Sequence, residues 1–118
     1  MEKVAIVVLA DTETHEALGR MVNALEAVKE FKEAGDEVRL IFDGAGVKWV
    51  TELSKPEHRL RALFAAVKDK VTGVCDYCAG AFGVKEGVQA CQLSLLSEYE
   101  SHPSFKKLVS EGYQIITF

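Results

Sequence analysis

Residues 3–10 read KVAIVVLA, a continuous aliphatic run rich in β-branched valine and isoleucine. Alternation of apolar and polar residues would indicate a strand with one face in water, whereas an unbroken run indicates a strand buried on both faces. Strands of that kind occur in parallel sheets covered by helices. The opening stretch therefore predicts an α/β fold.

The segments that follow alternate between helical and extended patterns. Apolar residues recur every three or four positions from Leu18 to Phe31, which predicts a helix that Gly35 ends. Residues 37–42, EVRLIF, predict a second strand. After these we expect one kinked or two separate helices over 47–70, a strand over 73–77, a short helix over 84–90 and a strand or helical turn over 93–96. Pro103 is expected to open a last helix, with Ser101 as its cap and with Phe105, Leu108 and Val109 facing inward. A strand over 113–118 is expected to follow it.

Strands that alternate with helices imply parallel pairing with right-handed crossovers. We therefore expect one domain over residues 1–118, a three-layer α/β/α sandwich around a mostly parallel sheet of about five strands. No linker, internal repeat or low-complexity segment divides the chain.

Composition narrows the class of function. The net charge is −4, whereas nucleic-acid-binding domains usually carry a basic surface, so no nucleic-acid partner is expected. No apolar run approaches the roughly 20 residues that span a bilayer, so no membrane partner is expected either. The three cysteines are an odd count, which argues against a disulfide framework and favours reduced thiols in the cytoplasm.

The carboxyl ends of parallel strands are where such folds place their functional crevice. Three loops begin there, at Asp11, Asp43 and Cys78. We expect Cys78 to lie near the beginning of a helix, where the thiolate form of a cysteine is favoured, with small residues leaving its sulfur uncrowded. The alternative is one more buried, inert cysteine.

Cys75 lies three residues before Cys78, and this odd offset along an extended strand would place the two side chains on opposite faces. A redox dithiol pair would need the chain to turn between them. Zinc binding by Cys75, Cys78, Cys91 and His102 is disfavoured, because the first pair lacks a polar, glycine-containing turn and Cys91 is expected in the core. No metal is therefore expected.

A second candidate crevice would bind an anion or nucleotide. The residues assigned to it are Asp11, His15, Asp43, Gly44 and Gly46. Residues 42–49, FDGAGVKW, contain only G-x-G, without the third glycine or the acidic residue of a dinucleotide fingerprint, so no cofactor is expected.

Several stretches, in this order, resemble the DsrE/DsrF-like family, which includes the TusD type of sulfur-relay subunit. They are KVAIVVL, ALGRMVNALEAVKEFKEAG, EVRLIFDGAGVKWV, VCDYCAGAFGV and LVSEGYQIITF. The resemblance implies a small three-layer domain with flavodoxin-like topology, assembled into trimers or hexamers. It also implies that a cysteine just after the third strand carries sulfur as a persulfide between a donor and an acceptor protein. That position falls on Cys78, whereas Cys75 matches only some members.

Three hypotheses follow. The first is a sulfur carrier in which Cys78 holds the persulfide and Cys75 resolves it by forming a disulfide; whether such a carrier counts as an enzyme stays open. The second is a small-ligand, nucleotide-binding or regulatory module without thiol chemistry. The third is a homo-oligomer whose role lies in assembly, with Trp49 or Phe82 at its interface.

Overall fold

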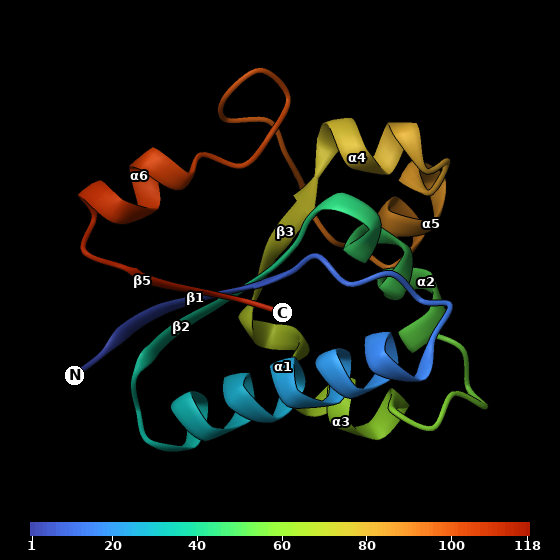
Figure 1. Ribbon diagram of the computed structural model, residues 1–118, viewed down its shortest axis with the longest axis horizontal. Coiled ribbons are helices and arrows are strands. Elements are labelled where there is room, and N and C mark those ends of the chain that lie inside the picture. The colour runs from blue at the N-terminus through green and yellow to red at the C-terminus, as the bar shows by residue number, and fades with distance from the viewer.

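The computed structural model describes residues 1–118 as one parallel sheet with helices on its faces (Figure 1). All four pairings between neighbouring strands are parallel, and the order is β4-β3-β2-β1-β5. The strands are β1 (Lys3–Val8), β2 (Glu37–Phe42), β3 (Val71–Cys75), β4 (Leu95–Leu96) and β5 (Gln114–Thr117). The structure confirms the α/β/α fold with its five-stranded sheet.

Six α-helices and two short 3₁₀ segments connect the strands. They are α1 (His15–Glu33), η1 (Gly44–Lys48), α2 (Trp49–Leu53), α3 (Arg61–Val67), η2 (Lys68–Lys70), α4 (Asp76–Ala81), α5 (Lys85–Ala90) and α6 (Phe105–Ser110). No helix is long and apolar enough to cross a membrane.

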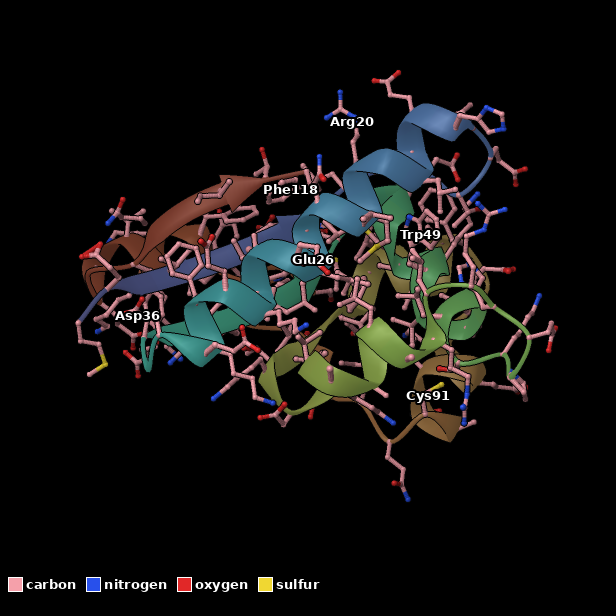
Figure 2. All side chains as sticks on the ribbon, turned by 90° about the horizontal axis from the view of Figure 1, so that it is seen from below. Arg20, Glu26, Asp36, Trp49, Cys91 and Phe118 are labelled. Carbon is pink, nitrogen blue, oxygen red and sulfur yellow. The ribbon has the colours of Figure 1, made fainter.

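The strand order explains how the helices are divided between the layers. From β1 to β4 each strand is added on the same side of the previous one, so right-handed crossovers keep the connecting helices on one face. The chain then returns across the sheet to place β5 beside β1, and α6 packs on the opposite face. Figures 1 and 2 show α1 and α3 side by side on the first face.

The strand order corrects the expected flavodoxin-like topology. In the flavodoxin order, 2-1-3-4-5, β1 lies between β2 and β3. Here β1 lies between β2 and β5, and β3 pairs with β2. The difference arises because β3 is added beside β2 instead of beside β1, and the chain reverses its direction across the sheet only after β4. No local sequence pattern specifies the point of this reversal.

The opening strand is buried on both faces, as its composition predicts. Val4, Ile6 and Val8 pack into the larger core beneath α1 and α3. Ala5 and Val7 belong to a smaller core on the other face. β1 ends at Val8 instead of Ala10, because the amides of the next two residues both donate to the Phe118 carbonyl.

The first helix also matches its prediction. Thr14 is the N-cap, and its hydroxyl accepts a hydrogen bond of 3.0 Å from the Ala17 amide. The helix ends at Glu33, and Gly35 follows with φ of +80°. The buried residues of its apolar stripe face the sheet.

The last helix is shorter than predicted and has a different cap. Ser104, and not Ser101, caps it by accepting from the Lys107 amide at 3.0 Å. Of its apolar residues only Leu108 is buried, whereas Phe105 and Val109 are exposed. The smaller core on this face of the sheet contacts only one side of this short helix, so the residues on its other sides stay exposed.

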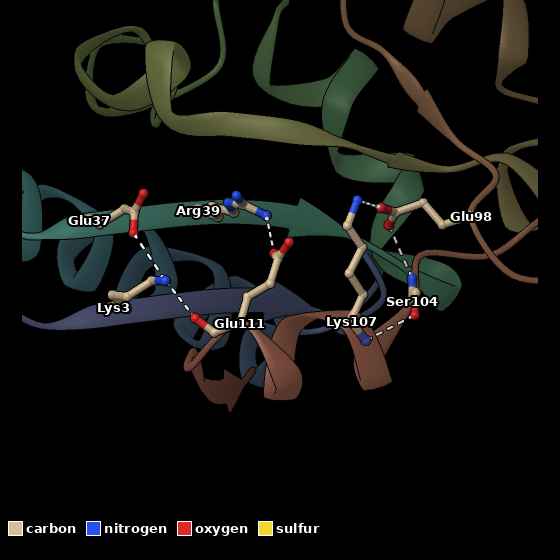
Figure 3. A network of polar contacts seen from close by, with 7 residues as sticks. All are labelled: Lys3, Glu37, Arg39, Glu98, Ser104, Lys107 and Glu111. Atoms are coloured by element: carbon tan, nitrogen blue, oxygen red, sulfur yellow. Dashed lines mark hydrogen bonds and ion pairs between the residues drawn. The ribbon is translucent and has the colours of Figure 1, made fainter.

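A polar network holds this helix against the sheet (Figure 3). The Lys3 ammonium donates to the Glu111 carbonyl at the end of α6 and lies 3.8 Å from Glu37. Arg39 on β2 lies 3.7 Å from the Glu111 carboxylate. These pairs are partly exposed, so each contributes at most about 1 kcal/mol, and their main effect is orientation.

Candidate functional site

Four side chains with metal-binding or proton-transfer chemistry meet at the carboxyl edge of the sheet. Asp43 follows β2, Cys75 ends β3, Cys78 lies in α4, and His102 lies in the loop before α6. One oxygen, nitrogen or sulfur atom from each lies within 4.8 Å of all the others. We call these four residues the sulfur cluster.

The two cysteines lie together because the chain turns between them. β3 ends at Cys75, which is the N-cap of α4, and its sulfur accepts a hydrogen bond from the Cys78 amide at 3.4 Å. The Tyr77 amide donates to the Ser101 carbonyl at 2.8 Å. The expected strand over 73–77 was therefore placed two residues too late, since β3 spans Val71–Cys75. The turn into α4 was not predicted, and it brings together two sulfurs that an extended strand would have kept on opposite faces.

Cys75 is the inner thiol of the cluster. Its side chain is fully buried, and its sulfur lies 3.3 Å from Nδ1 of His102. Burial is the main cause that raises the pKa of Cys75 to about 12, because the thiolate loses its hydration there. A raised pKa favours the protonated thiol, so Cys75 is poorly suited to be the first nucleophile.

Cys78 is the outer thiol and is partly exposed. Its sulfur donates to Oδ1 of Asp43 at 3.6 Å. The Asp43 carboxylate is only 8% exposed and also accepts from the Gly44 amide at 2.8 Å. None of the ion pairs in the structure involves Asp43, so this buried carboxylate faces a thiol without a compensating cation.

A tight turn presents His102 to the cluster. Tyr99 and His102 form an antiparallel bridge, and the two residues between them, Glu100 and Ser101, have φ of +46° and +69°. Positive φ at both central positions is the pattern of a type I′ turn, which usually contains Asn or Gly because other residues are strained there. The Tyr77 ring packs against the imidazole, with 4.9 Å between ring centres.

Glu98, which precedes this turn, is bonded to the beginning of α6 (Figure 3). Glu98 accepts from the Ser104 amide and from the Lys107 ammonium, both at 3.1 Å. The amide hydrogen bond is the first cause that holds the pKa of Glu98 below its usual value, and the Lys107 ammonium adds to it. The loop that carries His102 is thus held at both ends.

A hollow of about 510 Å³ lies beside the sulfur cluster. Asp43 and His102 line it, together with Tyr99, Pro103, Ser104, Phe105 and Lys106. Because two residues of the cluster form part of its wall, a reagent that enters the hollow comes close to Cys78.

A second hollow, of about 420 Å³, lies where the first helix begins; we call it the outer pocket. His15, Trp49, Glu52, His58 and Arg59 line it with residues 12–14 and Leu18. The Trp49 indole donates to the Ala10 carbonyl at 2.9 Å, which fixes the loop after β1 to α2.

The five residues of the second candidate crevice do not line a common pocket. His15 lines the outer pocket, and Asp43 belongs to the sulfur cluster. Asp11 is exposed and forms an ion pair with Lys48, whose hydrogen bond lowers the pKa of Asp11. Gly44 adopts φ of +54° in η1.

Gly46 is needed for packing. A Cβ atom at this position would lie 2.1 Å from the Val8 carbonyl oxygen, so no larger residue fits without a shift of the backbone. The G-x-G pattern therefore allows the turn after β2 to pass close to β1.

Cys91, which the zinc alternative included, lies elsewhere. It follows α5 (Figure 2). Its sulfur is 3.2 Å from the Ser54 hydroxyl. It is partly buried against the main core. Asp43 takes the place in the cluster that the sequence suggested for Cys91.

Comparison with known proteins places the chain in a family. The model of the DsrE/DsrF-like family matches residues 2–118. The chain belongs to this family. It is 40% identical over 96 residues to the uncharacterized protein MJ0733 of Methanocaldococcus jannaschii, and the match covers 81% of this chain and 78% of that protein.

The fold recurs in a solved structure. The conserved protein of unknown function BT1422 from Bacteroides thetaiotaomicron superimposes with a TM-score of 0.64. The alignment covers 97% of this chain and 94% of that one at 15% identity, so it supports the fold alone. Membership in the DsrE/DsrF-like family supports a sulfur-relay type of role in general.

Proposed function

We propose that the protein carries sulfane sulfur as a persulfide on Cys78. The observation that carries this proposal is the contrast between the two thiols of the cluster. Cys78 is partly exposed and donates to a carboxylate, whereas Cys75 is fully buried with its pKa raised. A sulfur carrier needs one accessible thiol with a proton acceptor beside it.

The loading step needs no external oxidant. Asp43 accepts the proton of Cys78, and the thiolate attacks the outer sulfur of a donor persulfide, R–S–SH. The donor S–S bond breaks, R–S⁻ leaves and takes up a proton, and Cys78–S–SH forms. Unloading is the reverse type of step, in which an acceptor nucleophile attacks the terminal sulfur and Cys78 leaves as thiolate.

Cys75 has a separate role in this scheme. Once Cys78 is loaded, the Cys75 thiolate attacks the inner sulfur, forms the Cys75–Cys78 disulfide and displaces HS⁻. The common location of the two sulfurs within the cluster supports this step. Burial of Cys75 makes it slow, since little thiolate forms. Cys75 thus limits the lifetime of a Cys78 persulfide that has not been transferred to an acceptor.

Mass spectrometry tests the proposal. The reduced protein is incubated with a small-molecule persulfide in the presence of a metal chelator, and its intact mass is measured. We expect a gain of about 32 Da, the mass of one sulfur atom, located on the peptide that contains Cys78. Absence of the adduct from the wild-type protein would refute the proposal.

Matched variants locate the sulfur. Cys91→Ser should load like the wild type, because this cysteine lies outside the cluster. Cys78→Ser should not load, and Cys75→Ser should load and keep its persulfide longer. An adduct that persists in Cys78→Ser contradicts the assignment.

Donor and acceptor proteins would reach the sulfur through the surface around the hollow. Exposed aromatic side chains gather on this part of the chain: Tyr77 and Phe82 on and after α4, and Tyr99 and Phe105 on either side of His102. Lys106 lines the same hollow and supplies a positive charge for an anionic persulfide. A cytoplasmic location, which keeps thiols reduced, suits this chemistry.

We also propose that the chain acts as a homo-oligomer, a trimer or a hexamer. Exposed Phe82 is available for such a contact, whereas Trp49 is buried in this chain. Light scattering of the purified protein gives its mass in solution, and a monomer would contradict this part of the proposal.

A second candidate function is ligand binding in the outer pocket. It is favoured by the gathering of His15, His58 and Arg59 around the indole of Trp49. A thermal-shift screen with nucleotides and inorganic phosphate tests it, because a bound ligand raises the unfolding temperature. Stabilisation that Cys78→Ser retains and Arg59→Ala loses would support this role.

A further inference from the structure

We propose that the sulfur cluster is also a zinc-binding site in which Asp43, Cys75, Cys78 and His102 each supply one ligand atom. The proposal goes beyond sulfur transfer and does not depend on it. It rests on the distances among the four ligand atoms, on the burial and charge of Asp43, and on the chemical nature of the donor set.

The geometry is close to a tetrahedral site. Zinc bonds of about 2.0 to 2.3 Å to nitrogen, oxygen and sulfur imply distances of roughly 3.3 to 3.8 Å between neighbouring ligand atoms. Nδ1 of His102 lies 3.3 Å from the Cys75 sulfur, and the Cys78 sulfur lies 3.6 Å from Oδ1 of Asp43. The remaining pairs lie within 4.8 Å, so closure around an ion needs movements of about 1 Å.

The charge of the site calls for a cation. Asp43 is more than nine-tenths buried, and no lysine or arginine pairs with it. Lys48, which lies in the next segment, pairs with Asp11 instead. An ionised carboxylate that is buried without a counterion is costly. A divalent ion removes that cost and replaces the thiol protons of Cys75 and Cys78.

The donor set selects the type of ion. Two thiolates, one imidazole and one carboxylate suit zinc, which accepts sulfur, nitrogen and oxygen ligands in tetrahedral sites. Calcium and magnesium require shells of six or more oxygen ligands, which this cluster does not provide. Four protein ligands would close the coordination sphere, as in sites that hold zinc without catalysis.

The surroundings already orient the ligands. The Cys78 amide donates to the Cys75 sulfur, and the Gly44 amide donates to the Asp43 carboxylate. The Tyr77 ring packs on the imidazole of His102. Outer-shell contacts of this kind hold metal ligands in place, and their loss typically weakens metal binding about 10- to 100-fold.

Metal titration tests the proposal. The reduced protein, stripped with a chelator, is titrated under anaerobic conditions with Zn²⁺ in competition with a chromogenic chelator. We expect one ion per chain and the release of about two protons as the two thiols become thiolates. Co²⁺ in place of Zn²⁺ should give the absorption bands of a tetrahedral site with sulfur ligands.

Variants distinguish this cluster from adventitious binding. Cys91→Ser is the matched control and should bind like the wild type, because its sulfur contacts Ser54 and not the cluster. Cys78→Ser, Asp43→Asn and His102→Gln should each weaken binding by more than the roughly 10- to 100-fold that loss of an outer-shell partner costs. Circular dichroism and the unfolding temperature show whether each variant is folded.

Two outcomes would overturn the zinc site. One is a wild-type protein that takes no Zn²⁺ from the competing chelator. The other is equal loss of affinity in Cys91→Ser and in folded Cys78→Ser. Sulfur loading is measured with a chelator present, so failure of the zinc site leaves that result unaffected. If both hold, Zn²⁺ should protect Cys78 from the persulfide donor.

Discussion

The sulfur cluster and the outer pocket lie at the same end of the sheet, yet they are built in opposite ways. The cluster joins residues 43, 75, 78 and 102 from four segments, and two of its members are buried. The outer pocket is lined by two local stretches, residues 12–18 and 49–59, and most of its residues are polar. One region gathers distant residues in a protected place, and the other exposes neighbouring ones.

This difference decides which chemistry each region supports. In the cluster, burial removes the hydration of thiolate and carboxylate, so protonation states and partner choice depend strongly on neighbours. In the outer pocket the imidazole and guanidinium groups of His15 and Arg59 stay in contact with water, where charge interactions are screened. Both regions therefore lie at the carboxyl edge of the parallel sheet, and the difference in their chemistry comes from the difference in burial.

The largest expected contrast is within the cluster. In metal-free protein at pH about 8, iodoacetamide should modify Cys78 readily and Cys75 extremely slowly. Raising the pKa of Cys75 from 9.0 to about 12 lowers its thiolate fraction about 1000-fold, and burial blocks the reagent as well. Peptide mass mapping over time measures both rates, and in urea all three cysteines should react. Equal labelling of Cys75 and Cys78 in the native protein would contradict the structure.

The next largest effect concerns η1, which joins the two regions. Gly46→Ala should lower the free energy of unfolding by about 3 kcal/mol, because the new Cβ would lie 2.1 Å from the Val8 carbonyl oxygen. Urea denaturation measures the change. Gly19→Ala is the control, since Gly19 lies on the exposed side of α1, where a Cβ meets no atom within 4 Å, and it should stabilise by up to about 1 kcal/mol. An unchanged midpoint for Gly46→Ala would mean that the turn relaxes freely.

A direct comparison of the two regions uses their two aspartates. Asp43→Asn should slow the loading of Cys78 about 100-fold, because it removes the acceptor of the thiol proton while keeping the side-chain shape. Asp11→Asn should leave the loading rate unchanged, since Asp11 pairs with Lys48 outside the cluster. Stopped-flow or quenched mass spectrometry gives the rates. Equal slowing in both variants would mean that general electrostatics controls the rate.

The smallest expected effect is the pH dependence of the Asp11–Lys48 pair. The Lys48 hydrogen bond lowers the pKa of Asp11 from 3.8, so the stabilisation is present above that value and is lost as pH falls through the folded-state pKa. The pair is solvent-exposed, so the change is small. As the pH is lowered from about 6 to about 3, the unfolding temperature should decrease slightly less steeply in Asp11→Asn than in the wild type. A steeper decrease in the variant would contradict the lowered pKa of Asp11.

Local patterns predict some elements of this chain closely. Residues 37–42 form β2 with the predicted bounds, and the helical stripe from Leu18 to Phe31 lies within α1. The helical stripe is long and strongly periodic, and the short strand is a mostly buried run of apolar residues, so the burial of both follows from their local pattern. The beginning of α4 at Asp76 was missed, because the Tyr77 amide in its first turn bonds the Ser101 carbonyl of a distant loop. The cap at Ser104 is a local contact with the Lys107 amide, and the choice of Ser101 in its place was wrong.

The sequence by itself determined the parallel α/β architecture and singled out Cys78, since apolar periodicity and the alternation of strands with helices along the chain can be read from short stretches. Only the tertiary structure decided that Asp43 and His102 meet the two thiols and that Cys91 does not. That meeting depends on the return of the chain from β4 to β5 and on the turn at Glu100 and Ser101. Contacts between segments so far apart in the chain arise from packing, which no local pattern encodes.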